Sequence, residues 1–120
     1  MASKYIDLST VKFFMNIVQE LETVLEKERF VDHDLESVNL YVDSVKQFAD
    51  KELFPYFKEM DENPAHYKDG SIHVHKQVEK MMKDGGSMGL IAAPFNYEDG
   101  GLQLPLLAHT AANYILDAAN

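Results

Sequence analysis

The chain has 120 residues, a length that suits one small domain. Its 11 basic and 20 acidic residues leave a formal charge of −9, which repels phosphate backbones and anionic lipid headgroups and so excludes nucleic acid and membrane surfaces as expected partners. The absence of cysteine excludes disulfides and thiolate chemistry and fits a cytoplasmic location, and no apolar run approaches the roughly 20 residues that a membrane span needs.

The first expected helix covers residues 8–27. Asp7 or Ser9 can cap its start, because a short side-chain oxygen accepts from the free N–H groups of a first turn. Apolar residues recur at steps of three and four, at Val11, Phe14, Val18, Leu21 and Leu25, and this stripe is widened by Phe13, Ile17 and Val24. So broad a stripe predicts burial against more than one neighbour.

The second expected helix begins after Asp34, a further capping residue, and extends to about Asp61. Pro55 interrupts it, because the proline ring clashes with the preceding turn and offers no N–H, so a kink is predicted there. One face of this helix is apolar, with Val38, Tyr41, Val42, Val45, Phe48, Ala49 and Leu53.

A loop is expected from Glu62 to about His73, with turn signals at Asn63-Pro64 and Asp69-Gly70. The third helix should cover residues 74–84 and end at Gly85-Gly86. Its inward side chains are expected to be Val78, Met81 and Met82.

The segment 87–103 is irregular but apolar, and the last helix is expected from about Leu104, with Pro105 in its first turn. That helix runs to Asn120 without a stop signal. Its apolar face consists of Leu107, Ala111, Tyr114, Ile115 and Ala118. Since no segment is typical of a strand of convincing length, the predicted class is all-α, a small domain of about four helices.

His73 and His75 form the most conspicuous local pattern. Two imidazoles two residues apart can bind one metal from an extended backbone, with Asp69 or His66 as a third ligand. Spacing alone does not show that ligands converge, so a structural or surface role is the favoured interpretation and no metal ligand is assigned.

Other residue groups also favour a structural interpretation. The carboxylates fall on polar helix faces or in loops, which predicts solvated charge rather than a catalytic pair; they are Glu20, Glu22, Glu26, Glu28, Asp61 and Glu62. The run GGSMG at residues 85–89 resembles a phosphate loop but lacks its lysine and preceding strand, so a helix end followed by a close backbone approach is expected. The methionines Met60, Met81, Met82 and Met88 could line a lipid-like pocket, although core packing is the default.

Three segments resemble the N-terminal domain of acyl-CoA dehydrogenases. They read FADKELFP at residues 48–55, GSMGLIAAP at 86–94 and YEDGGLQLP at 97–105. The likeness is collinear from about Lys4 to Asn120, and the stretch Tyr5 to Phe30 resembles the extra N-terminal helices of a larger subgroup. Gln103 stands where the family often has glycine. The resemblance divides the chain into an extra helical segment, 1–33, and an N-terminal-like domain, 34–120, which together form one folded unit.

The resemblance implies a parent flavoenzyme that oxidises acyl-CoA thioesters between their α and β carbons. FAD lies between a middle β-domain and a C-terminal helical bundle, a carboxylate on the C-terminal side abstracts the proton, and an electron-acceptor flavoprotein reoxidises the flavin. In the family, the N-terminal domain helps to wall the acyl cavity. No catalytic, cofactor-binding or metal-binding residue is carried over to this chain, which is expected neither to bind FAD nor to catalyse by itself.

Two hypotheses follow. In the first, the chain is the N-terminal fragment of an acyl-CoA dehydrogenase, and apolar surface left uncovered makes it a homo-oligomer or rearranges its helices. In the alternative, it is a stand-alone helical protein-interaction module without enzymatic activity. The reading frame beyond Asn120 discriminates between them: a long β-rich and helical continuation supports the first, and a stop codon supports the second.

Overall fold

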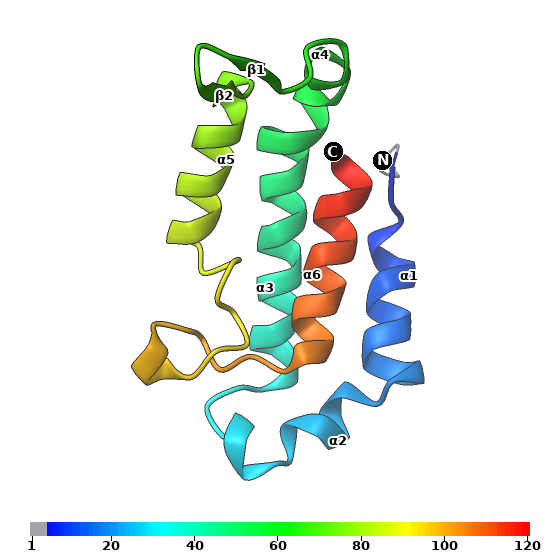
Figure 1. Ribbon diagram of the computed structural model, residues 1–120. Helices are drawn as coiled ribbons and strands as arrows, with labels where there is room; N and C mark the ends of the chain where they lie inside the picture. Colours follow the sequence, from blue (N-terminus) through cyan, green and yellow to red (C-terminus); the bar gives the residue numbers. More distant parts are fainter. Residues whose placement is uncertain (1–4) are drawn as a thin grey trace.

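The computed structural model describes residues 5–120. Its helices run side by side in a flat body with extents of 52 × 38 × 17 Å, in the order α5, α3, α6 and α1 (Figure 1). The predicted all-α class is confirmed. In chain order, the elements are α1 (Leu8–Phe13), η1 (Phe14–Val18), α2 (Leu21–Leu25), η2 (Glu28–Phe30), α3 (Leu35–Phe48), η3 (Ala49–Leu53), η4 (Phe54–Tyr56), α4 (Phe57–Glu62), β1 (His66–Lys68), β2 (Ser71–His73), α5 (Lys76–Ser87), η5 (Tyr97–Asp99) and α6 (Leu106–Ala119).

The first predicted helix is interrupted. Asp7 caps α1 as expected, because its side chain accepts from the backbone N–H of Ser9 at 3.2 Å. The chain then passes through the π-helical turn η1, and Glu20 takes a left-handed conformation with φ 52° before α2 begins. A left-handed residue cannot continue a right-handed helix. The prediction of one continuous helix over residues 8–27 is therefore wrong.

The apolar stripe of this N-terminal region is less buried than predicted. Val11, Met15 and Leu21 belong to the core. Four large side chains that the stripe was expected to bury are between 48% and 64% exposed, and we call them the N-terminal apolar patch: Phe13, Phe14, Ile17 and Val18. A helix at the edge of a flat body lacks a second neighbour to cover them (Figure 1).

The second predicted helix agrees closely with the structure. Asp34 and Ser37 form a reciprocal capping box at the start of α3, with bonds of 2.7 and 3.0 Å. Around Pro55 the α-helix gives way to the π-helical turn η3 and the 3-10 turn η4, and it resumes as α4. The predicted interruption is therefore confirmed. Its expected face lies in the core, with only Tyr41 partly buried.

The loop predicted between residues 62 and 73 contains a small hairpin. β1 pairs with β2 in an antiparallel register that places His66 opposite His73. Asp69 and Gly70 have φ angles of 51° and 81°, the positive values of a two-residue type I′ turn, for which Asp-Gly is a preferred sequence. The turn position was predicted correctly, and strands of three residues agree with the prediction that no strand of convincing length occurs. These strand residues are all exposed.

The third helix ends later than predicted. Gly85 and Gly86 lie inside α5, and Gly89, with φ 77°, follows the last turn. The N–H of Leu90 donates to the carbonyl of Gly85 and that of Gly89 to the carbonyl of Gly86, both at 3.0 Å, which is a Schellman cap. A Cβ at Gly89 would lie 2.7 Å from Leu102 Cδ1. The expected helix end with close backbone approach is thus present, shifted toward Gly89.

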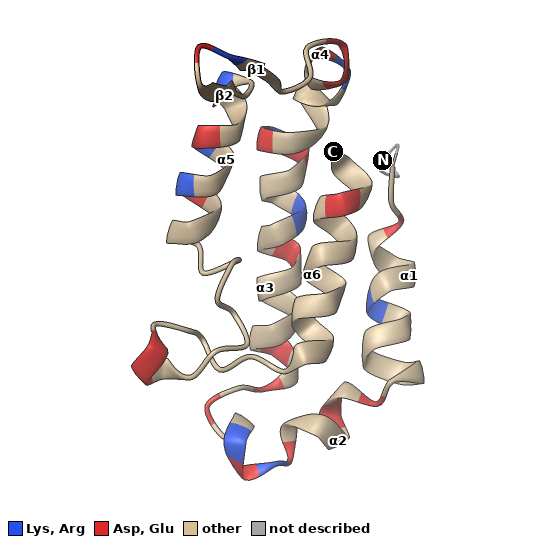
Figure 2. Ribbon diagram, viewed as in Figure 1, with Lys and Arg blue, Asp and Glu red and all other residues tan. Residues whose placement is uncertain are grey.

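The last helix, α6, packs against α3 through small residues. Ala108, Ala112 and Ala119 are buried together with Ile115, whereas Tyr114, predicted on the apolar face, is exposed. α6 carries a single charged residue, Asp117 (Figure 2). Within residues 5–120, no helix combines the length and apolar character that a membrane span requires.

Candidate functional site

An apolar groove runs along one side of α6, between that helix and α5. We call it the α5–α6 groove; its cavity volume is about 360 Å³. Phe48 at the end of α3, Leu53 in η3 and the segment after α5 complete the walls. Its apolar lining is Phe48, Leu53, Met81, Met82, Leu90, Ile91 and Leu116.

Gly85 lies in the wall of the groove, where α5 packs closely on Phe48 and Leu90. A Cβ at this position would sit 3.5 Å from Leu90 Cδ1 and 3.7 Å from Phe48 Cζ, in ordinary van der Waals contact. A larger side chain there would press on Phe48 and Leu90, both of which line the α5–α6 groove. Met82 is 58% exposed and lines the rim, so the expectation that it packs inward is wrong, whereas Met81 is half-buried against the core.

Two polar side chains enter this apolar lining, both from α6. His109 and Asn113 lie one helical turn apart, and the Asn113 amide nitrogen is 3.1 Å from His109 Nε2. The other ring nitrogen, Nδ1, is buried and has no hydrogen-bond partner. An apolar cleft with a few convergent polar groups is the usual form of a small-molecule site.

A second groove flanks the other side of α6. It lies against α1 and η1, has a cavity volume of about 340 Å³ and is lined by apolar side chains that include Phe14, Met15 and Leu107. It adjoins the N-terminal apolar patch at Phe14. The outward side of α6 is therefore a ridge between two apolar grooves.

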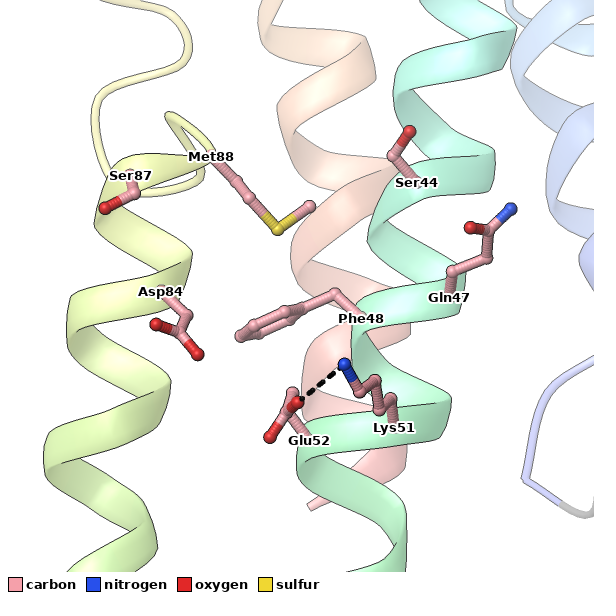
Figure 3. Close-up of a pocket in the computed structure, with 8 residues that line it drawn as sticks. All are labelled: Ser44, Gln47, Phe48, Lys51, Glu52, Asp84, Ser87 and Met88. Atoms are coloured by element: carbon pink, nitrogen blue, oxygen red, sulfur yellow. Dashed lines mark ion pairs between the residues drawn. The ribbon is translucent and has the colours of Figure 1, made fainter.

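A polar cleft opens on the opposite side of α3, with α6 behind it (Figure 3). Glu52 lies at its base and is only 6% exposed. The cleft otherwise presents hydroxyl, amide and charged groups, with Ser44, Gln47, Lys51, Asp84 and Ser87 around Phe48 and Met88.

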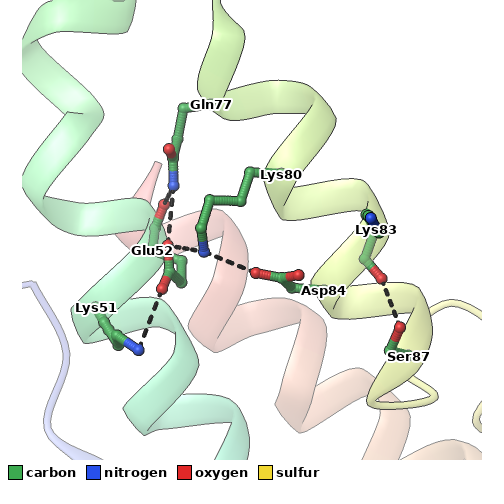
Figure 4. A network of polar contacts seen from close by, with 7 residues as sticks. All are labelled: Lys51, Glu52, Gln77, Lys80, Lys83, Asp84 and Ser87. Carbon is green, nitrogen blue, oxygen red and sulfur yellow. Dashed lines mark hydrogen bonds and ion pairs between the residues drawn. The ribbon is translucent and has the colours of Figure 1, made fainter.

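Glu52 is the centre of a network that joins η3 to α5 (Figure 4). Its carboxylate lies 2.7 Å from Lys80 Nζ and accepts from Gln77 Nε2 at 3.1 Å, while Gln77 also donates to the Glu52 carbonyl at 2.9 Å. Lys80 also pairs with Asp84 at 2.7 Å. Each polar group of this buried contact is satisfied, so the network fixes α5 against α3 and thereby the width of the α5–α6 groove.

The network shifts the pKa values of its members in a consistent way. The Lys80 hydrogen bond lowers the pKa of Glu52 in spite of desolvation, and it lowers the pKa of Asp84 as well. The bonds from Lys80 to Asp84 and to Glu52 raise the pKa of Lys80 to about 12. All three groups are thus ionised at neutral pH, which suits a structural clamp and not a proton-transfer group.

In the structure, His73 and His75 have different partners. His75 caps α5 by accepting from the N–H of Gln77 at 3.2 Å, and its Nε2 lies 2.9 Å from Glu59, whose pKa is lowered by that bond. His66 and His73 stack across the hairpin with ring centroids 5.4 Å apart. Over residues 5–120, no three potential ligands come together as a metal site, and Asp69 lies in the hairpin turn.

The candidate carboxylates remain apart from the grooves. Glu20, Glu22, Glu26, Glu28, Asp61 and Glu62 are all exposed. Sequence reasoning missed the buried acid, Glu52, although a signal existed: Glu52 follows Phe48 by one helical turn, beside an apolar face. It also missed His109 and Asn113, which are spaced one turn apart in a helix otherwise almost free of polar side chains.

Comparison with known proteins agrees with the resemblance in the sequence. Residues 36–120 match the family model described as "Acyl-CoA dehydrogenase, N-terminal domain". The chain belongs to this family. A search of curated proteins and a search of solved structures found no match.

The family is generally FAD-dependent, but the two grooves beside α6 do not fit the phosphates of a flavin cofactor. The flavin pyrophosphate needs free cations or convergent N–H donors. Lys80 is bonded to Glu52 and Asp84, and neither α6 groove is lined by lysine or arginine. No reaction step is therefore assigned to a flavin at these residues.

Proposed function

We propose that this chain serves as the N-terminal domain of an FAD-dependent acyl-CoA dehydrogenase and walls the cavity for the acyl chain without taking part in the chemistry. The observation that carries the proposal is the α5–α6 groove, because an apolar cleft lies within the residues that match the family and beside the segment GSMGLIAAP at residues 86–94, which carries part of the resemblance. A hydrocarbon chain placed there gains from removal of apolar surface from water.

The flat shape supports the same role. α6 exposes Leu106 and Tyr114 on a ridge with an apolar groove on either side, and it has only one charged residue (Figure 2). An exposed apolar surface of this kind is typical of an interface. In an acyl-CoA dehydrogenase, further protein would cover the ridge and close the groove around the substrate. Without that cover, the 120-residue chain is expected to associate with itself.

The test uses the gene product encoded by the entire reading frame. It should carry a flavin absorbance band that acyl-CoA bleaches under anaerobic conditions. Gly85→Leu should press on Phe48 and Leu90 in the lining of the groove and shift kcat/KM toward short acyl chains, whereas Gly70→Leu, in the exposed hairpin turn, should leave the chain-length preference unchanged. A flavoprotein whose preference is insensitive to Gly85→Leu would refute the wall role of this groove.

The runner-up is a stand-alone helical interaction module, which the N-terminal apolar patch favours because four large side chains lie together without cover. Such a module would bind its partner with no flavin and no acyl-CoA turnover.

Sedimentation of the 120-residue chain tests whether the chain associates with itself, as the first proposal expects. A monomer at millimolar concentration would contradict the expected homo-oligomer.

A further inference from the structure

The second groove, between α1 and α6, has an exposed apolar stripe along each of its walls. We call it the α1–α6 groove. On the first wall, Thr10 and Phe14 lie four residues apart, and Ile17 and Val18 follow about one helical turn later, with 64% and 48% of their surface exposed. Residues at such intervals share one side of a helix. The N-terminal apolar patch is therefore a continuation of this wall.

The second wall comes from α6, which runs beside α1 (Figure 1). Leu106, Thr110 and Tyr114 follow one another at intervals of four residues, and the last two line the groove. The ridge of α6 and the groove thus lie side by side on one face of the molecule. We call this surface the α1–α6 face; it consists of the groove and the exposed side chains Phe13, Phe14, Ile17, Val18, Leu106 and Tyr114.

The α1–α6 face has the composition of a protein interface. Among residues 5–120, no charged side chain lines its groove, although the chain carries a formal charge of −9. Three of its six exposed apolar side chains are aromatic. Depletion of charge and enrichment of aromatic residues distinguish the core of an interface from the rest of a protein surface. A protein partner is therefore favoured over an ionic or polar ligand.

The exposed apolar area is large enough for a second copy of the chain. The six side chains are between 48% and 67% exposed, so together they offer on the order of 600 Å², since a large side chain has an area of roughly 150–250 Å². Two such faces brought together would remove about 1,200 Å² from water, which is the lower limit for a specific interface. An association of this size is weak, so it requires concentrated protein and dissociates on dilution.

The polar groups of the face also suit a like partner. Gln19, Thr110 and Tyr114 are exposed at the groove. A hydroxyl or an amide both donates and accepts, so each can pair with the same group of a second copy across a two-fold axis. Identical charged groups would repel each other there. Because ridge and groove are neighbours, the same rotation places the ridge of each copy over the groove of the other.

We propose that the α1–α6 face is a two-fold interface between copies of this chain, with the α6 ridge of one copy in the α1–α6 groove of the other. The inference rests on the self-association expected under the proposed function and names the surface that carries it. The acyl-chain role of the α5–α6 groove, on the other side of α6, does not depend on this interface.

Sedimentation equilibrium of the 120-residue chain, from micromolar to millimolar concentration, tests the proposal. The expected result is a monomer–dimer equilibrium. Ile17→Glu brings a charge into the interface and should raise the dissociation constant about 10-fold or more. Ile72→Glu is the matched control, because it adds the same charge at an isoleucine that is 72% exposed on the hairpin, and it should leave the dissociation constant unchanged.

The α6 wall is tested in the same way. Leu106→Glu should weaken the dimer, whereas Leu40→Glu, at a position of α3 that is 58% exposed, should not. All four substitutions are at exposed positions, so each variant should keep the helical circular dichroism spectrum of the unaltered chain.

A direct readout needs no variant. In a mixture of isotope-labelled and unlabelled chain, filtered nuclear Overhauser contacts between copies should connect Leu106 or Tyr114 with residues of the α1–α6 groove. Contacts confined to the α5–α6 groove would overturn the proposal. So would a dimer that Ile17→Glu and Leu106→Glu leave unchanged. A chain that stays monomeric at millimolar concentration would also overturn it and leave the face to a different protein. None of these results would change the outcome expected for Gly85→Leu, which tests the acyl-wall role separately.

Discussion

The helix formed by α3 and η3 and the N-terminal region formed by α1 and η1 have equally apolar sequences but different surroundings in the fold. α3 lies between α5 and α6 and has its expected apolar face in the core, whereas α1 and η1 lie at the edge and leave the N-terminal apolar patch in solvent (Figure 1). Periodicity thus predicted which side chains of each helix could be buried. The number of neighbours decided which of them are.

The largest expected effect is on the free energy of unfolding, and it compares an isoleucine in the core with an isoleucine in the N-terminal apolar patch. Ile115→Ala removes a fully buried side chain opposite α3 and should lower the free energy of unfolding by about 2–5 kcal/mol. Ile17→Ala, at a position that is 64% exposed, should change it by less than about 1 kcal/mol. Urea unfolding measures both variants. Comparable losses would show that the N-terminal patch is covered in solution, for instance by a second copy.

The next effect concerns the turn that precedes α6. A Cβ at Gly101 would lie 2.2 Å from the Phe95 carbonyl oxygen, so Gly101→Ala should destabilise the chain by about 1–3 kcal/mol through overpacking. Gly86→Ala in α5 is the matched control, because its Cβ would meet only Ile91 Cδ1 at 3.7 Å and alanine favours helix. Thermal unfolding should separate the two variants. An equal response would contradict the close approach at Gly101.

Tyr41 is the one polar side chain in the predicted face of α3. Its hydroxyl is buried and unpartnered, so Tyr41→Phe should stabilise the chain by roughly 1 kcal/mol near neutral pH.

Burial also raises the pKa of Tyr41 from its ordinary value of 10.0 to about 12. The neutral phenol therefore contributes stability that is complete below pH 10.0 and is lost as the pH rises through about 12. The advantage of Tyr41→Phe should consequently grow across this interval. Lys80, whose pKa is also raised to about 12, is present in both proteins and cancels from the comparison. A pH-independent difference would place the hydroxyl in contact with water.

The smallest effect tests the interruption of the N-terminal helix. Glu20 has a φ of 52°, a region that glycine occupies without steric cost, so Glu20→Gly should be neutral or stabilise by up to about 1 kcal/mol. Glu22→Gly, inside α2, should destabilise by about 0.5–1 kcal/mol instead. Chemical denaturation of both variants suffices. A loss at Glu20 equal to that at Glu22 would indicate a continuous helix in solution.

The candidate site shows where sequence reasoning stops. The sequence offers Met60, Met81, Met82 and Met88 as possible lining of a lipid-like pocket, with core packing as the favoured interpretation. Met81 and Met82 line the α5–α6 groove, whereas Met88 lines the polar cleft. The Glu52 network and the His109–Asn113 pair were not recognised, because their partners are separated along the chain or depend on which side of α6 faces a cavity. Gln103 is a similar case. The family pattern has glycine where this residue adopts a φ of 52°, and the sequence alone did not show the backbone conformation that the structure gives this residue.

The sequence by itself determined the helical class, the cap at Asp34, the interruption at Pro55 and the turn at Asp69-Gly70, because each depends on neighbours within a few residues. The sequence also indicated the family, because the three segments that resemble it lie within the residues that match the family model. Only the tertiary structure decided that the N-terminal apolar patch stays exposed, that Glu52 is buried among Gln77 and Lys80, and that α6 is a ridge between two apolar grooves. Those features depend on which helices become neighbours, and local periodicity holds no information about that choice.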